Sequence, residues 1–215
     1  MDSTDGFEII VRQAVAYASP RITVEQWQSG EKNDIDIFED QVRGWFFDQI
    51  RALRSRNNPD HQHSGPAVLA LVTPYFEMLT AYHEGRASER GETTKFLKRG
   101  LEAVLGTSFV PAIDRFVVEV RNGLFHELVF RTVLIHTESN SDLPNFGIQP
   151  AYRFGEFEPS AELLCVNPFW LADEAEQYLN KYLTHLRSPG SGDQRELLKR
   201  FDAFMAVRKS REPGV

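Results

Sequence analysis

The sequence predicts a mainly α-helical protein with one small β-hairpin insertion. Apolar residues recur at three- and four-residue steps in several long segments, which is the spacing of amphipathic helices. Two short segments, 128–135 and 161–166, are instead rich in β-branched and apolar residues, as strands are. The composition, 41% hydrophobic and 26% charged over 215 residues, is that of an ordinary folded domain with its own core.

The segment 1–33 has no clear secondary structure, and the first clear helix is predicted to begin at Asp34. Residues 7–18 fit a short helix or a strand equally well, and 30–33 is typical of a loop. From Asp34 to about Arg56 an apolar stripe predicts one long helix, which the polar residues 57–60 end. Three aromatic residues of this helix are expected in the core rather than on a surface that stacks bases: Trp45, Phe46 and Phe47.

Three more helices are predicted to follow the loop at 61–65. The first begins with Pro66 in its first turn and runs to about residue 83. It is apolar on most of its circumference, so it should be the central helix, with a kink at Pro74. The next helix runs over 93–105, and the fourth begins near Pro111.

The last third of the chain is predicted to contain the hairpin and then two helices. The two strand-like segments would form a β-hairpin at about 128–166, with a long irregular connection. Asn167 is a suitable N-cap for a helix that ends near Arg187. The expected organisation is an N-terminal segment (1–33), a helical domain (34–187), a Ser/Pro/Gly linker (188–192) and a C-terminal amphipathic helix with its tail (193–215).

Charge and cysteine content exclude several classes of function. A net charge of −7 argues against broad, sequence-independent binding to nucleic acid, which needs clustered Lys and Arg. Cys165 is the single cysteine, so an intrachain disulfide and a cysteine metal cluster are both excluded. Neither a signal peptide nor a membrane span is evident, which predicts a cytoplasmic protein without membrane contact. No metal and no cofactor is expected.

The fourth helix has a second face that is unusual for a solvated surface. On a helical wheel, Val118 and Phe125 lie opposite the apolar stripe, among cations and polar groups. Exposed apolar residues in this position favour contact with another helix or with a second subunit. The stripe itself is predicted to face the core and consists of Ile113, Phe116, Val117, Val120 and Leu124.

The end of this helix carries side chains suited to phosphate chemistry. Arg121 offers a planar set of donors that fits phosphate oxygens and stays charged. His126 titrates near neutrality and can transfer a proton. Asn122 precedes His126 by four residues, so it can lie on the same side and orient a ribose or the imidazole.

The run Arg121-Asn122-x-x-x-His126 resembles the R-N-x-x-x-H form of the arginine–histidine motif of HEPN domains. The helical order from Asp34 to about Arg187 is also similar, since a late helix bears the motif after a buried apolar helix. The resemblance implies an HEPN-like helical bundle that dimerises. Many members are metal-independent ribonucleases of toxin–antitoxin or antiviral defence systems, so it also implies that Arg121 and His126 cleave RNA and that Asn122 supports them.

The resemblance further implies a homodimer with an RNA cleft at its axis and no cofactor. Cleavage would be a transesterification that leaves a 2′,3′-cyclic phosphate, and an antitoxin would restrain it. Two other functions stay open. One is a non-catalytic dimeric interaction module that uses Val118 and Phe125 as anchors, and the other is a nucleotide-binding partner of a separate nucleotidyltransferase.

Each candidate residue also has a purely structural interpretation. Arg121 could be a surface cation and His126 a histidine at a helix end. Glu77 lies in the predicted central helix, where a carboxylate is costly unless it is paired. It could be partly exposed or bound to a structural arginine, or it could form a salt bridge to Arg121 and orient it for the reaction.

Overall fold

The computed structural model confirms a mainly helical protein with a small sheet. It describes residues 17–55, 63–124, 132–137, 143–153, 156–190 and 192–209, with only the backbone at 150–153 and 156–161. The expectations for 7–16, for the stop signal at 57–60 and for the strand residues 128–131 therefore lie outside the described residues.

The predicted first helix begins at Asp34 and continues to Arg54. Its parts are α2 (Asp34–Val42), a π-helical turn η1 (Arg43–Phe47) and α3 (Asp48–Arg54). The side chain of Asn33 caps it by accepting a hydrogen bond from the backbone of Asp36, which caps Asn33 in return. A short helix α1 (Val24–Gln28) precedes it, and residues 30–33 form the predicted loop.

The π-helical turn η1 changes which aromatic residues reach the core. Phe47 is buried and Phe46 is partly buried, as expected, but the side chain of Trp45 is 50% exposed, so its predicted core position is wrong. A π turn inserts one extra residue, and Phe47, five residues after the buried Val42, takes the inward position. Gly44 within this turn lies against Pro20, where a Cβ would come within 2.5 Å of the proline ring.

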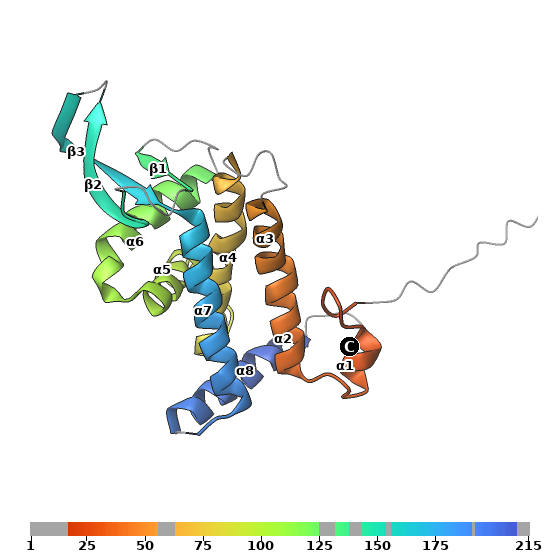
Figure 1. Cartoon of the computed structure of the whole chain (residues 1–215). Helices are drawn as coiled ribbons and strands as arrows, with labels where there is room; N and C mark the ends of the chain where they lie inside the picture. The colour runs from red at the N-terminus through yellow and green to blue at the C-terminus, as the bar shows by residue number, and fades with distance from the viewer. Residues whose placement is uncertain are drawn as a thin grey trace, which may run out of the picture.

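Helix α4 (Gly65–Glu84) is the central helix, as predicted, and Pro74 lies in its interior. It contacts α3, α5 (Thr93–Leu105), α7 (Pro168–Arg187) and α8 (Gly192–Lys209) (Figure 1). Helix α5 closely matches the third predicted helix. Gly85 ends α4 in the left-handed conformation that glycine favours. Where α4 and α5 cross, a Cβ on Gly100 would lie 2.0 Å from the carbonyl oxygen of Phe76, so the two backbones are in contact.

The fourth predicted helix is present and runs through Gly123. A short 3₁₀ turn, η3 (Thr107–Phe109), leads into α6 (Val110–Phe116) and then into a second π-helical turn, η4 (Val117–Arg121). Helical backbone continues over residues 122–124, where the described segment ends. We refer to residues 110–124 as the motif helix.

The sheet differs from the single predicted hairpin. Its strands are β1 (Val133–Ile135), β2 (Phe146–Arg153) and β3 (Glu156–Val166), in the order β1-β3-β2. The two predicted strand segments do pair, but β1 runs parallel to β3, with Val133 opposite Leu164. The antiparallel hairpin is instead formed by β2 and β3, and β2 lies in the stretch that was expected to be irregular.

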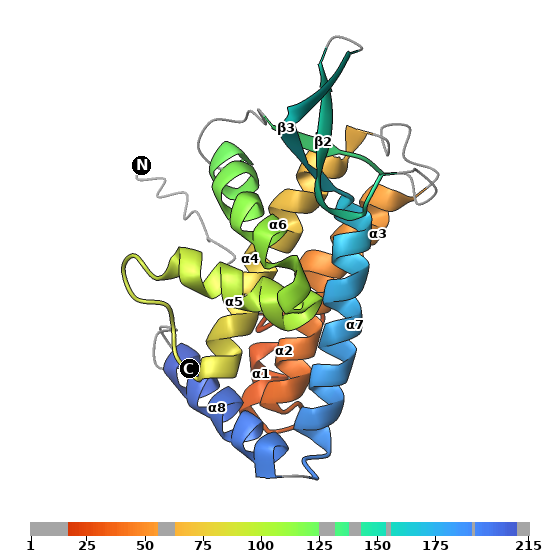
Figure 2. The ribbon, with the colours of Figure 1, turned by 90° about the vertical axis from the view of Figure 1, so that its left-hand side faces the viewer.

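Two helices complete the fold: α7 runs along the bundle, and α8 lies at the end far from the sheet. Asn167 caps α7 (Pro168–Arg187) as predicted, by accepting from the backbone of Phe169 and Trp170. Helix α7 begins at the sheet and ends near α8 (Gly192–Lys209), which lies across the far end of α4 (Figure 2). Phe201 of α8 is fully buried there.

None of the helices in the described part of the chain combines the length and the apolar character needed to cross a membrane.

Candidate functional site

The motif helix is oriented as the sequence predicts. Every member of its apolar stripe is buried, and the helix packs against α5 and the sheet, whereas Asn122 is exposed and Arg121 is half-buried. Of the two predicted interface residues, Val118 is 61% exposed. The other, Phe125, lies outside the described residues, as does the predicted catalytic His126.

Arg121 and Asn122 form a polar pair at the end of the motif helix. The guanidinium of Arg121 donates from Nη1 to the Asn122 side-chain oxygen over 3.3 Å. It forms no ion pair with any carboxylate among the described residues. By contrast, Arg115 on the same helix is bound to Glu119 through two nitrogens, at 2.9 and 2.8 Å. The Arg121 guanidinium is therefore the one on this helix that is not committed to a described carboxylate.

Glu77 lies near Arg121 without binding it directly. Burial raises the pKa of Glu77, against the opposing effects of a hydrogen bond from Ser88 and the positive charge of Arg121. The Ser88 hydroxyl donates to Glu77 over 3.3 Å. The salt bridge to Arg121, one of the interpretations open for Glu77, is not formed within the described structure. The alternative of a half-buried structural carboxylate fits Glu77 better, with Ser88 as its partner.

A network that the sequence did not predict joins the motif helix to the sheet. The Arg115 guanidinium also donates from Nη2 to the backbone oxygen of Glu162 on β3, over 3.2 Å. On the other side, Glu119 accepts a hydrogen bond from the hydroxyl of Thr132, next to β1. The Arg–Glu spacing of four residues is a sequence signal for a helical ion pair, but nothing local indicates that this pair also binds two strands.

Described residues on either side of the segment that contains His126 belong to the motif helix or bind it. The described backbone ends within this helix at Leu124 and resumes at Thr132, whose hydroxyl donates to Glu119 of the same helix.

No group of three or more His, Cys, Asp or Glu side chains suited to a metal ion occurs in the portion of the chain that is described. Among the described residues, Asn122 binds Arg121, Glu77 senses the charge of Arg121, and Ser88 binds Glu77.

The chain matches no family model, no curated protein and no solved structure with which it was compared.

Proposed function

We propose that this protein is an HEPN-like, metal-independent endoribonuclease that acts as a homodimer. Arg121 binds and polarises the scissile phosphate, His126 transfers the proton and Asn122 positions both. The proposal rests on the resemblance of residues 121–126 to the HEPN motif. The observation that supports it is the Arg121 guanidinium: it is accessible, bound to Asn122 and not neutralised by a described carboxylate.

The proposed reaction is transesterification within RNA. A base removes the proton of a ribose 2′-hydroxyl, and the 2′-oxygen attacks the adjacent phosphorus. The bond from phosphorus to the 5′-oxygen breaks, and that oxygen takes up a proton. The products are a 2′,3′-cyclic phosphate and a 5′-hydroxyl. Arg121 stabilises the negative charge that develops on the phosphate oxygens, which is the step where a fixed cation contributes most.

A homodimer accounts for the second proton transfer. One chain supplies a single Arg121–His126 set, whereas the reaction needs one group to accept a proton and another to donate one. Two copies related by a two-fold axis supply both, and the exposed Val118, one turn before Asn122, is available at such an interface. An antitoxin that covers the same cleft would hold the activity in check.

The first test is cleavage of single-stranded RNA by purified protein in the presence of EDTA. We expect His126→Ala and Arg121→Ala each to lower the rate by at least 100-fold, because each removes a group that acts in the transition state. The product ends should be 2′,3′-cyclic phosphates, which phosphatase alone does not remove.

Two exposed residues on other helices supply matched controls. His185→Ala on α7 and Arg195→Ala on α8 remove the same side-chain types far along the chain from the motif. Both should retain the full rate. If His126→Ala and Arg121→Ala cleave as fast as these controls, the catalytic assignment fails.

The exposure of Val118 also supports a second candidate, a non-catalytic dimeric interaction module. In that case Val118 and Phe125 would anchor the interface, and no cleavage would be detected. Val118→Glu should then convert a dimer to a monomer in sedimentation-velocity experiments, because a charge in an apolar interface has no partner. A dimer that survives this substitution argues against Val118 as an interface residue.

A further inference from the structure

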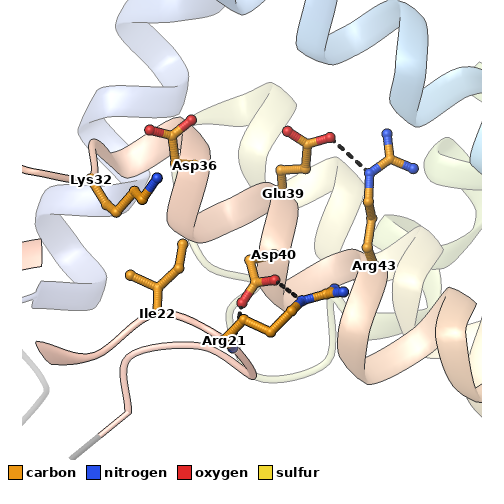
Figure 3. A pocket seen from close by; sticks show the side chains of 7 residues that line it. All are labelled: Arg21, Ile22, Lys32, Asp36, Glu39, Asp40 and Arg43. Atoms are coloured by element: carbon orange, nitrogen blue, oxygen red, sulfur yellow. Dashed lines mark hydrogen bonds and ion pairs between the residues drawn. The ribbon is translucent and has the colours of Figure 1, made fainter. Parts of the chain in front are cut away.

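A hollow of about 390 Å³ lies on a different part of the molecule from the motif helix. It is formed where the loops before and after α1 meet α2 (Figure 3). Cations and carboxylates alternate around it: Arg21 and Lys32 come from the loops, and Asp36, Asp40 and Arg43 come from the helix. Ile22, which is almost fully buried, provides an apolar surface between the charges.

The carboxylates of this hollow are already bound by protein donors. Asp40 accepts three hydrogen bonds: from the Ser19 hydroxyl at 2.6 Å, and from Arg21 through its backbone N at 2.8 Å and its Nε at 2.6 Å. Glu39 accepts from Arg43 at 2.7 Å and from Arg187 at 2.6 Å. Acceptors engaged in this way have little capacity left for a cationic ligand.

Arg43 is committed as well. Its Nε donates to Glu39, its Nη1 donates to Glu176 at 3.1 Å and its Nη2 donates to Asn180 at 2.7 Å. Two of the three guanidinium nitrogens thus join the first long helix to α7, and the third binds Glu39 within that helix.

Lys32 is the cation of the hollow that no described carboxylate neutralises. The carboxylates near it in sequence are bound elsewhere: Glu31 by Gln26, and Asp34 by Trp27 and Lys209. Asp36 accepts from the backbone of Asn33 and from Arg187.

A hydrogen bond holds the backbone of Lys32, whereas its ammonium group has no described carboxylate partner. Its main-chain nitrogen donates to the carbonyl oxygen of Gln26 over 3.0 Å, at the end of α1. The ammonium group extends into the hollow in Figure 3, between Asp36 and Ile22.

Arg21 has one further donor available. Its Nε binds Asp40 and its Nη2 binds Asp48, whereas its Nη1 has no acceptor in the described structure. The side chain is 59% exposed, so a ligand can reach this nitrogen. The uncommitted hydrogen-bonding groups of the hollow therefore belong to two cations, whereas its acceptors are occupied.

We propose that this hollow binds a small organic anion through its carboxylate or phosphate oxygens. Lys32 binds the oxyanion, Arg21 provides a second cationic contact and Ile22 packs against the carbon skeleton. The volume falls in the range of roughly 300–1,000 Å³ typical of small-molecule sites. Because Lys32 and Arg21 flank α1 in sequence, the bound anion also joins the two loops on either side of α1.

The test uses two probes, inorganic phosphate and succinate, titrated separately at constant ionic strength. Isothermal titration calorimetry of the full-length protein should show one saturable site for at least one probe. We expect Lys32→Ala to weaken this binding at least tenfold. Its circular dichroism spectrum and melting temperature should not change without ligand, since Lys32 has no ion pair to lose.

Lys199→Ala is the matched control, because this α8 lysine is 78% exposed and outside the hollow. It should bind the probe as the unaltered protein does. Tighter binding of phosphate would assign a phosphorylated ligand, and tighter binding of succinate would assign a carboxylic acid. No saturable binding of either probe overturns the proposal. Equal binding by Lys32→Ala, or an equal loss in both lysine variants, overturns it as well.

Discussion

His83 shows how burial changes the chemistry of a single residue in this fold. It lies near the end of α4, with its ring centroid 5.7 Å from that of Tyr178 and 5.0 Å from that of Tyr182. Burial, aided by the positive charge of Arg200, lowers the pKa of His83 to about 4. The imidazole is therefore neutral in the folded protein at pH values where it is partly charged in an unfolded chain.

The lowered pKa of His83 predicts a loss of stability in mild acid. The unfolded chain takes up a proton near pH 6.5, whereas the folded protein resists it until about pH 4, so the free energy of unfolding falls as pH falls through this window. The effect is at most about 3 kcal/mol, at about 1.4 kcal/mol per unit of pKa difference. Chemical denaturation of His83→Phe should show a correspondingly smaller loss between pH 6.5 and pH 4.

Other groups titrate in the same pH window, so the measurement compares the free energy of unfolding of His83→Phe with that of the unaltered protein. Carboxylates contribute alike to both proteins and cancel in the difference. Parallel stability curves for His83→Phe and the unaltered protein would show that His83 is not protected from protonation.

The close crossing of α4 and α5 depends on one glycine. Gly100 leaves no space for a methyl group, because a Cβ would overlap the carbonyl of Phe76. The helices would have to separate, and neighbouring core residues such as Phe96 and Leu101 would lose packing.

Gly100→Ala is therefore expected to destabilise the protein by about 3 kcal/mol in urea denaturation, despite the better helix propensity of alanine. Gly192→Ala is the control. Gly192 lies in the first turn of α8, and a methyl group at this position would meet no atom within 4 Å, so the effect should stay within about 0.5 kcal/mol. A near-neutral Gly100→Ala would mean that the two helices can shift apart at little cost.

The helices were predictable because their signals are local. Apolar residues located α4 and α5, and the capping side chain of Asn167 marked the start of α7. The two π-helical turns were not predictable, because a wheel with 100° per residue assumes regular α-helix. Strand β2 was missed because Gly147 and Pro150 weaken a strand pattern, and the parallel pairing of β1 with β3 depends on residues far apart in the sequence.

The candidate sites were predictable to different degrees. The helical wheel predicted that Val118 is exposed and that Arg121 and Asn122 lie outside the buried stripe. The pairing of Glu77 did not, because a spacing pattern shows which helix a residue is on but not its distance from a neighbouring helix. Lys32 had no signal at all, since its free charge depends on where each surrounding carboxylate is bound.

At the scale of the whole molecule, α8 belongs to the main core rather than to a separate C-terminal segment. The ring of Phe201 lies 5.5 Å from that of Phe38 on α2 and 5.3 Å from that of Tyr82 on α4. Arg208 donates to Gln41 over 2.9 Å and to the hydroxyl of Tyr82. Helix α8 thus joins α2 to α4 through both apolar and polar contacts.

Phe201→Ala should accordingly destabilise the entire protein, by about 3–5 kcal/mol, because it leaves a large cavity among buried rings. Thermal unfolding followed by far-UV circular dichroism and by tryptophan fluorescence should shift together, as a single transition. Lys199→Ala, on the exposed side of the same helix, should leave the transition in place. Separate transitions for the two signals would indicate that α8 unfolds independently.

The strand order has a consequence for synthesis on the ribosome. The middle strand, β3, is the last of the three to be translated, so β1 and β2 have no partner within the sheet when they emerge. The α4–α5 pair, in contrast, is complete long before β3 appears. In the nascent chain, α4 and α5 therefore meet before the sheet beside the motif helix forms, because that sheet needs β3.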